Sequence, residues 1–181
     1  MKRVLVIGGL LSASSLLTLG LTPQKPPESV ETLVGGYGKW TKVNDKPFPV
    51  GFWMDMLCRN LTKKEVEFIQ ASPHHKKYIT VFVNPLGKES MLKNLTFPVG
   101  SVIVKEKHLE PNGPTELSTV MIKRSKGFNP DCGDWEFATL GSSGKKVTSS
   151  GKIQSCMSCH MTQKNADFTY RTYASYAAKR G

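Results

Sequence analysis

Four segments in the second half of the chain have the composition of β-strands and are joined by short connections. The first reads Tyr-Ile-Thr-Val-Phe-Val-Asn, rich in the β-branched and aromatic residues that favour strands. The connections include Pro111-Asn112-Gly113-Pro114 and Asn129-Pro130, which favour turns. Successive strands with short polar connections usually pair antiparallel. The sequence therefore predicts an α+β, mainly β domain with an antiparallel sheet, whose strands cover residues 78–84, 101–107, 117–124 and 135–140.

Two short helices are expected beside this sheet. Thr62-Lys63-Lys64-Glu65 is a capping box in front of a helix that ends near Ser72. A second helix is expected over residues 87–93. The chain has 181 residues and no internal repeat, so one domain accounts for the length once the N-terminal segment is set aside.

The N-terminal segment has the pattern of an export signal. Met1-Lys2-Arg3 is basic, and an apolar run with interspersed Gly and Ser follows from Val4 to Leu21. The run is close to the length of a membrane span, so an uncleaved anchor is the alternative, which the Gly and Ser content disfavours. We expect a signal peptide over 1–21, a Pro- and Gly-rich linker over 22–38, and the folded domain over 39–181.

The chain is basic, with 25 Lys and Arg against 14 Asp and Glu and a net charge of +11. Such a charge can indicate nucleic-acid binding. The lysines are scattered, however, and no nucleic-acid motif accompanies them. We interpret the charge as a solvated surface that suits an acidic redox partner.

Cys156-Met157-Ser158-Cys159-His160 is the strongest motif in the chain. Cys-x-x-Cys-His is the attachment signature of c-type haem. On a helix, two thiols three residues apart share one face and can bond to the two haem vinyl groups, while the adjacent histidine ligates the iron. We therefore expect one covalent haem c, held by Cys156 and Cys159, with His160 as an axial iron ligand.

Two other kinds of site use paired cysteines. A thioredoxin-type site needs a βαβ setting, which is missing here, and a zinc site needs a second ligand pair. The remaining cysteines, Cys58 and Cys132, are isolated in the sequence. In an oxidising compartment we expect them to form a disulfide, with two free thiols as the alternative.

The sequence leaves the sixth iron ligand open. Met157 lies inside the attachment loop and Met161 directly follows the axial histidine, so neither reaches the opposite haem face easily. The remaining candidates are histidines, each more often a surface residue than a ligand: His74, His75 and His108. Without a sixth ligand, the iron would be open to small molecules.

Several longer segments resemble a known family. Asn84-Pro85-Leu86-Gly87, Phe97 to Lys107, Val120 to Arg124, Gly127 to Phe137 and the final Cys-x-x-Cys-His motif are similar, in order and spacing, to the cytochrome P-460 family. The resemblance covers about Trp40 to Tyr173. It implies an antiparallel-sheet domain with a C-terminal haem, commonly dimeric and periplasmic.

The resemblance also implies a role for one lysine. In the enzymes that give the family its name, a lysine in a Val-x-Val-Lys-Glu strand is cross-linked to the haem and the iron oxidises hydroxylamine; the matching residue here is Lys105. In a relative, cytochrome c′-beta, the same fold lacks the cross-link and binds nitric oxide and similar gases. Strand alternation places Lys105 with Ser101 and Ile103, opposite Val102 and Val104, and either face can be the inner one.

Hydroxylamine oxidation also needs a distal base to accept protons. The candidates are Glu136, which we take first, and Glu106 and Glu116, each by default a surface carboxylate. The sequence departs from the family at one point, because Ile79 stands where the name-giving enzyme has an arginine.

Three functions follow as hypotheses. The first is oxidation of a small nitrogen species such as hydroxylamine, with electrons passed to a soluble cytochrome. The second is gas binding without catalysis, with Phe82 or Phe97 covering the distal haem face. The third is simple electron transfer, which requires one of the histidines as a strong sixth ligand.

Overall fold

The computed structural model describes residues 28–50, 63–64, 67 and 77–171. Within them the chain forms one seven-stranded sheet in the order β1-β3-β4-β5-β6-β7, with β2 also pairing with β3, and every pairing is antiparallel. The strands are β1 (Thr41–Lys42), β2 (Phe48–Val50), β3 (Lys77–Val83), β4 (Val102–His108), β5 (Thr115–Lys123), β6 (Trp135–Leu140) and β7 (Val147–Gly151). The predicted antiparallel, mainly β fold is therefore confirmed.

The four predicted strands correspond to β3, β4, β5 and β6. Their register aligns Val81, Lys105 and Thr119 across β3, β4 and β5. Alternation along β4 puts neighbouring residues on opposite faces of the sheet. The direction of the Lys105 side chain therefore depends on which face receives the odd-numbered residues of β4.

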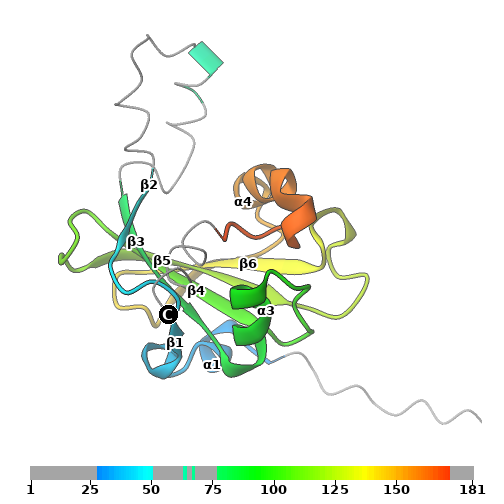
Figure 1. The fold of residues 1–181 in the computed structure, drawn as a ribbon, viewed down its shortest axis with the longest axis horizontal. Coiled ribbons are helices and arrows are strands. Elements are labelled where there is room, and N and C mark those ends of the chain that lie inside the picture. Colours follow the sequence, from blue (N-terminus) through cyan, green and yellow to red (C-terminus); the bar gives the residue numbers. More distant parts are fainter. Residues whose placement is uncertain (1–27, 51–62, 65–66, 68–76, 172–181) are drawn as a thin grey trace, which may run out of the picture.

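Short helices connect and flank the strands (Figure 1). The predicted helix over 87–93 is α3 (Lys88–Lys93), where Glu89 lies in the first turn and pairs with Lys93 at 2.6 Å. Both charges complement the helix dipole. The helix predicted over 62–72 lies mostly outside the described residues. The other helices are α1 (Val30–Leu33), α4 (Gln154–His160) and the 3₁₀ helices η1 (Tyr37–Lys39), η3 (Pro85–Gly87), η4 (Pro130–Cys132) and η5 (Met161–Ala166).

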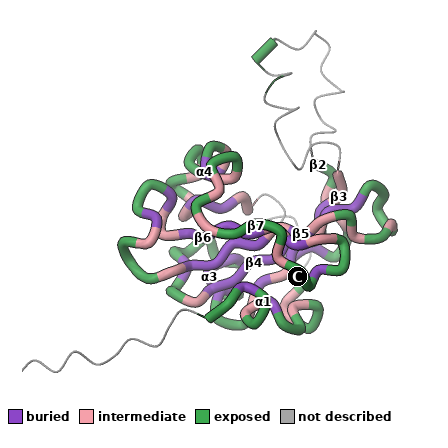
Figure 2. Tube along the Cα trace, turned by 180° about the vertical axis from the view of Figure 1, so that it is seen from behind, coloured by how far each residue is buried: buried purple, intermediate pink, exposed green. Residues whose placement is uncertain are grey.

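Both faces of the sheet are covered, by different parts of the chain. The α4 face, defined here as the face that packs against α4, includes Ile79, Val81, Ile103, Met121 and Phe137 together with Met157 of α4. The α1 face, which packs against α1, includes Val102, Val104, Val120, Ile122 and Ala138. Figure 1 shows α4 and α1 on opposite sides of the sheet, and Figure 2 shows the central strands buried.

Residues 28–38 differ from the expected linker. They contain α1, which Ser29 caps by accepting a hydrogen bond from Thr32 N, and Val30 and Val34 are buried against the α1 face. The helix is only four residues long, and apolar burial rather than helix propensity holds it in place. The folded domain therefore begins before residue 39.

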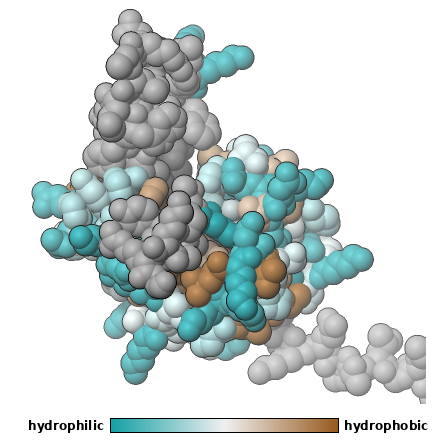
Figure 3. Space-filling model, viewed as in Figure 1, coloured by the Kyte–Doolittle hydropathy of each residue, from teal (hydrophilic) through white to brown (hydrophobic). Residues whose placement is uncertain are grey.

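The face shown in Figure 3 has both hydrophilic and apolar areas among its described residues. The exposed large apolar side chains of the described residues include Leu86, Leu92 and Leu95, on and around η3 and α3. No helix in the described part of the chain has the length and apolarity needed to cross a bilayer. Residues 1–27 lie outside that part, so the signal peptide stays a prediction.

Candidate haem site

The Cys-x-x-Cys-His motif lies on α4, as its spacing predicts. The helix follows β7 closely: the backbone N–H groups of Cys156 and Met157 both donate to the Ile153 carbonyl, each at 3.0 Å. Met157 and His160 are buried, whereas Cys156 and Cys159 are partly exposed. The buried Met157 thus anchors α4 on the sheet and leaves the two thiols at the edge of the core.

His160 has one nitrogen committed to the backbone. Its Nδ1 lies 2.6 Å from the Phe168 carbonyl oxygen. A carbonyl can only accept, so Nδ1 is the donor and Nε2 carries the lone pair of the neutral ring. Burial, together with the positive charge of Lys105, lowers the His160 pKa to about 3, although the bond to Phe168 opposes this shift. The imidazole is therefore neutral and has the tautomer required for an iron ligand through Nε2.

The two thiols of the motif are free and not activated. Cys156 and Cys159 are free cysteines, and burial raises the pKa of each. A redox-active Cys-x-x-Cys site depends on a lowered thiol pKa, so the structure argues against a thioredoxin-type activity. Within the described residues no group of three or more His, Cys, Asp and Glu is placed to hold a metal ion.

Aromatic rings surround the His160 imidazole. The Phe137 ring centroid lies 5.1 Å from that of His160, and the Tyr170 ring meets it edge-on at 5.4 Å. The Tyr170 hydroxyl donates to the Cys159 carbonyl at 3.1 Å. Phe137, Tyr170 and the Phe168 carbonyl carry no motif signal in the sequence. Together these contacts give an apolar, oriented histidine beside two free thiols, which fits a covalently attached haem.

Lys105 lies on the α4 face, with its side chain directed toward the motif. Its Nζ is 5.8 Å from the centre of the Tyr170 ring. Burial lowers the Lys105 pKa to about 8, and the nearby Cys156 sulfur partly offsets this effect. The residue is 6% exposed, although lysine is rarely buried so deeply. The structure thus places Lys105 beside the cysteine motif.

A second lysine shares this face. Lys107 is buried, and burial is also the main cause of its lowered pKa; Glu116, Lys77 and Cys156 act on it electrostatically. Lys77 and Glu116 form an ion pair at 2.7 Å, which lowers the Glu116 pKa. Lys107 is not among the site residues predicted from the sequence. It lies two residues after Lys105 in β4, however, and strand alternation therefore puts both side chains on the same face.

The expected distal base, Glu136, lies on the face of the sheet away from the cysteine motif. It lies in β6 between Trp135 and Phe137, which face α4, and so its own side chain points to the α1 face. There its carboxylate pairs with Arg124 at 2.5 Å. The strand pattern alone did not show which face of the sheet would pack against the motif.

Glu106 is also on the α1 face. It accepts a hydrogen bond from the Tyr37 hydroxyl at 2.8 Å and lies 3.7 Å from His108 Nε2. Burial and the contact with Glu106 raise the Tyr37 pKa to about 12. Of the three carboxylates considered, Glu116 is the one that neighbours the lysines of the α4 face.

The same geometry removes two other candidates. His108 is on the α1 face, with Nδ1 3.0 Å from the Gly113 carbonyl oxygen, so it is not placed as a sixth ligand. Phe82 packs on Tyr37 at 5.5 Å, also on the α1 face, and does not cover a haem beside α4. Phe97 belongs to the core of the α4 face and stacks edge-on with Trp135 at 5.2 Å.

The remaining predicted residues are the two methionines near the motif, two histidines and the other two cysteines. Met157 is buried under α4 and Met161 is 45% exposed at its end. His74 and His75 lie outside the described residues. Cys132 is a buried free cysteine whose pKa burial raises to about 11, which differs from the expected disulfide; Cys58 lies outside the described residues.

Comparison with known proteins agrees with this geometry. No curated protein matches the chain. The family described as cytochrome P-460 matches residues 59–171, which is more than half of the sequence and includes β3, Lys105 and the complete cysteine motif. The chain therefore belongs to the cytochrome P-460 family, and this membership implies a haem cofactor.

Proposed function

We propose that the protein is an exported mono-haem c-type cytochrome that binds and oxidises small nitrogen species such as hydroxylamine. Cys156 and Cys159 would hold the haem covalently, and His160 Nε2 would ligate its iron. When bound, the haem supplies the redox chemistry. The chain's own residues orient the ligand, exclude water from it and provide a lysine at the macrocycle.

One observation carries the enzymatic proposal: Lys105 is buried on the same face as the motif, close to Cys156 and the Tyr170 ring. Burying a lysine costs free energy unless the charge is compensated or removed. A lowered pKa makes a larger fraction of the amine neutral and nucleophilic. An N–C bond from Lys105 Nζ that replaces a C–H bond of the macrocycle would remove the charge from this buried position. Its formation releases two protons and two electrons, which a peroxide would accept as it is reduced to water.

A mass-spectrometric experiment tests this proposal. The haem-loaded protein is digested, and the haem-bearing peptides are identified. We expect a species that joins the Lys105 peptide to the Cys156–Cys159 peptide through haem, and its loss in Lys105→Met. Lys107→Met is the matched control because Lys107 is a second buried lysine on the same face. A mature protein with haem on the two cysteines alone would contradict the cross-link.

Gas binding without catalysis is the second candidate, and the placement of carboxylates favours it. Glu136 and Glu106 face away from α4, and Glu116 pairs with Lys77. Ile79, at the position of the family's arginine, is buried on the α4 face. Optical spectra distinguish the two functions: hydroxylamine should reduce the iron of an enzyme over repeated turnovers, whereas a gas-binding protein should bind nitric oxide and show no turnover.

Export and electron transfer complete the proposal. The basic N-terminus and apolar run support a periplasmic location, and the positive charge supports docking of an acidic soluble cytochrome. Reduction of such a cytochrome by the loaded protein should slow as ionic strength rises. A rate that is independent of salt would contradict electrostatic docking.

A further inference from the structure

Two successive residues after η5 adopt the left-handed backbone conformation. Asp167 has φ 50° and ψ 45°, and Phe168 has φ 58°. Neither is a glycine, and for a bulky residue such as Phe this conformation is unusual and strained. Such a conformation persists only where the surroundings hold it.

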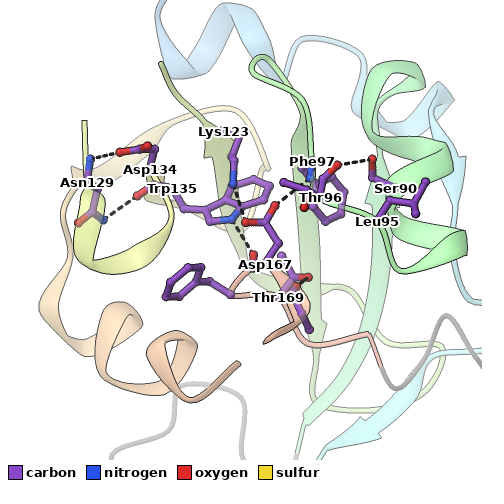
Figure 4. Close-up of polar contacts among 12 residues, drawn as sticks. Ser90, Leu95, Thr96, Phe97, Lys123, Asn129, Asp134, Trp135, Asp167 and Thr169 are labelled. Carbon is purple, nitrogen blue, oxygen red and sulfur yellow. Dashed lines mark hydrogen bonds and ion pairs between the residues drawn. The ribbon is translucent and has the colours of Figure 1, made fainter. Parts of the chain in front are cut away.

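Asp167 is held from three directions (Figure 4). Its carboxylate accepts the backbone N–H of Phe97 at 2.8 Å and pairs with Lys123 Nζ at 2.6 Å. Its backbone carbonyl accepts a hydrogen bond from Trp135 Nε1 at 2.8 Å. These partners come from three separate parts of the fold: the loop after α3, the end of β5 and the start of β6.

Phe168 is held by its neighbours as well. Its N–H donates to the Gln163 carbonyl at 2.8 Å. Its ring lies directly against Gly133, where a Cβ atom would overlap it. With both residues fixed, the Phe168 carbonyl points at His160 Nδ1 and accepts its hydrogen bond at 2.6 Å.

From this geometry we infer that Asp167 is a positioning residue for the axial ligand. It holds the 167–168 backbone in the conformation that aims the Phe168 carbonyl at His160, and so sets the orientation and donor strength of His160 Nε2. The inference rests on the haem attachment proposed above. Asp167 acts through the backbone, since its carboxylate is directed to Phe97 and Lys123.

The hydrogen bond at Nδ1 has a measurable electronic effect. A bond from Nδ1 to an acceptor makes the imidazole a stronger donor, and stronger donation stabilises the oxidised iron. Weakening of the bond should therefore raise the reduction potential and lower the frequency of the iron–histidine stretch. A residue with a purely structural role would leave both quantities unchanged.

The test uses Asp167→Gly in the full haem-loaded chain. Glycine adopts the left-handed conformation freely, so the variant removes the carboxylate without a new backbone cost. Asp134→Gly is the matched control, because Asp134 also has a positive φ of 60° and its carboxylate accepts two backbone N–H groups, from Gly127 and Asn129. The Asp134 carboxylate bonds within its own turn and not to the segment around Phe168, so its loss tests general destabilisation.

We expect the potential to rise and the iron–histidine frequency to fall in Asp167→Gly, with both unchanged in Asp134→Gly. Asp167→Asn, which keeps an acceptor oxygen but loses the charge, should give a smaller shift in the same direction. Equal values in the Asp167→Gly and Asp134→Gly proteins would overturn the inference. Covalent haem is measured first by mass: a haem-free wild type would defeat the proposed function, whereas haem-loaded Asp167→Gly with wild-type potential would defeat the positioning role alone.

Discussion

At the residue scale, a lysine on the α4 face defines the site. Three strands, β3, β4 and β5, place Lys105 beside Val81 and Thr119, and α4 closes over it. The sequence predicts that neighbouring residues of β4 lie on opposite faces of the sheet, but it does not predict which of them face α4. Val102 and Val104 on one side and Ile103 on the other are equally apolar, so each face could be buried, and in fact both are.

The buried charge predicts a pH dependence in the chain before haem attachment. The folded pKa of Lys105 is lowered to about 8, from an unfolded value of 10.5, so between these pH values the unfolded chain binds more protons and stability rises with pH. Lys105→Met removes the penalty. The variant should be more stable at pH 7 by on the order of 3 kcal/mol, with the difference vanishing by about pH 10.5.

Urea unfolding of the two haem-free chains at several pH values measures this difference. Lys126→Met is the control, because it removes a lysine from an exposed position. A constant offset between the wild type and Lys105→Met across the range would contradict the assignment.

Cys156, Cys159 and His160 could be proposed from the sequence as haem-binding residues, because their chemistry is in their side chains. The Phe168 carbonyl could not, since every residue has a carbonyl and only the fold aims this one at His160. Asp167 and Phe168 adopt the left-handed conformation although neither is a glycine, so the sequence does not indicate the turn. The side of the sheet on which Glu136 lies could not be predicted either, because the period-two pattern is the same for either choice of face.

At the element scale, η4 and the chain after η5 hold His160 from outside α4. Gly133, at the end of η4, has φ 60° and leaves the space that the Phe168 ring fills. The contact joins a turn between β5 and β6 to the chain that follows α4. The packing of Phe168 on Gly133 therefore links the sheet to the carbonyl that accepts the hydrogen bond from His160.

Gly133→Ala should lower the free energy of unfolding by about 2–4 kcal/mol, through the positive φ and the overlap with Phe168. It should also raise the reduction potential, because the Phe168 carbonyl must move. Gly127→Ala is the matched control: Gly127 has φ 93° but open space around its Cα, so the variant incurs the backbone cost alone. Denaturation measures the free energy of unfolding, and spectroelectrochemistry measures the reduction potential. Equal reduction potentials in Gly133→Ala and Gly127→Ala would contradict the proposed effect of Gly133 on the Phe168 carbonyl.

Strands and helices whose residues strongly favour that structure could be predicted from the sequence. Short elements with little apolar content or no visible periodicity could not. β3, β4 and β5 contain successive β-branched residues, β6 has two aromatic residues, and α3 has its charges at the expected ends. β7 reads Val-Thr-Ser-Ser-Gly, with little apolar content, and is recognised only because it pairs with β6. α1 has four residues, too few for periodicity to show.

At the scale of the whole molecule, one sheet separates two environments. The α4 face has the cysteine motif and Lys105, whereas the α1 face has the valine-rich core and the Tyr37–Glu106 contact. The backbone of the sheet lies between them. A change on the α1 face should therefore affect stability without reaching the haem.

Val34→Ala tests this separation. Val34 is 3% exposed against the α1 face, so the truncation should cost about 1–2 kcal/mol of stability. The optical spectrum and reduction potential of the loaded protein should stay at their wild-type values. Val99→Ala, at a residue 56% exposed, should leave stability unchanged. A changed potential in Val34→Ala would show that the two faces are coupled.

The alternation of β4 between these environments has a practical use in engineering. Substitutions of Val102 and Val104, on the α1 face, can be used to change thermal stability while the absorption spectrum and reduction potential stay the same. Substitutions of Ile103 and Lys105, which alternate with them along β4 and lie on the α4 face, can be used to change the redox properties. A single stretch of seven residues thus provides two independent sets of controls.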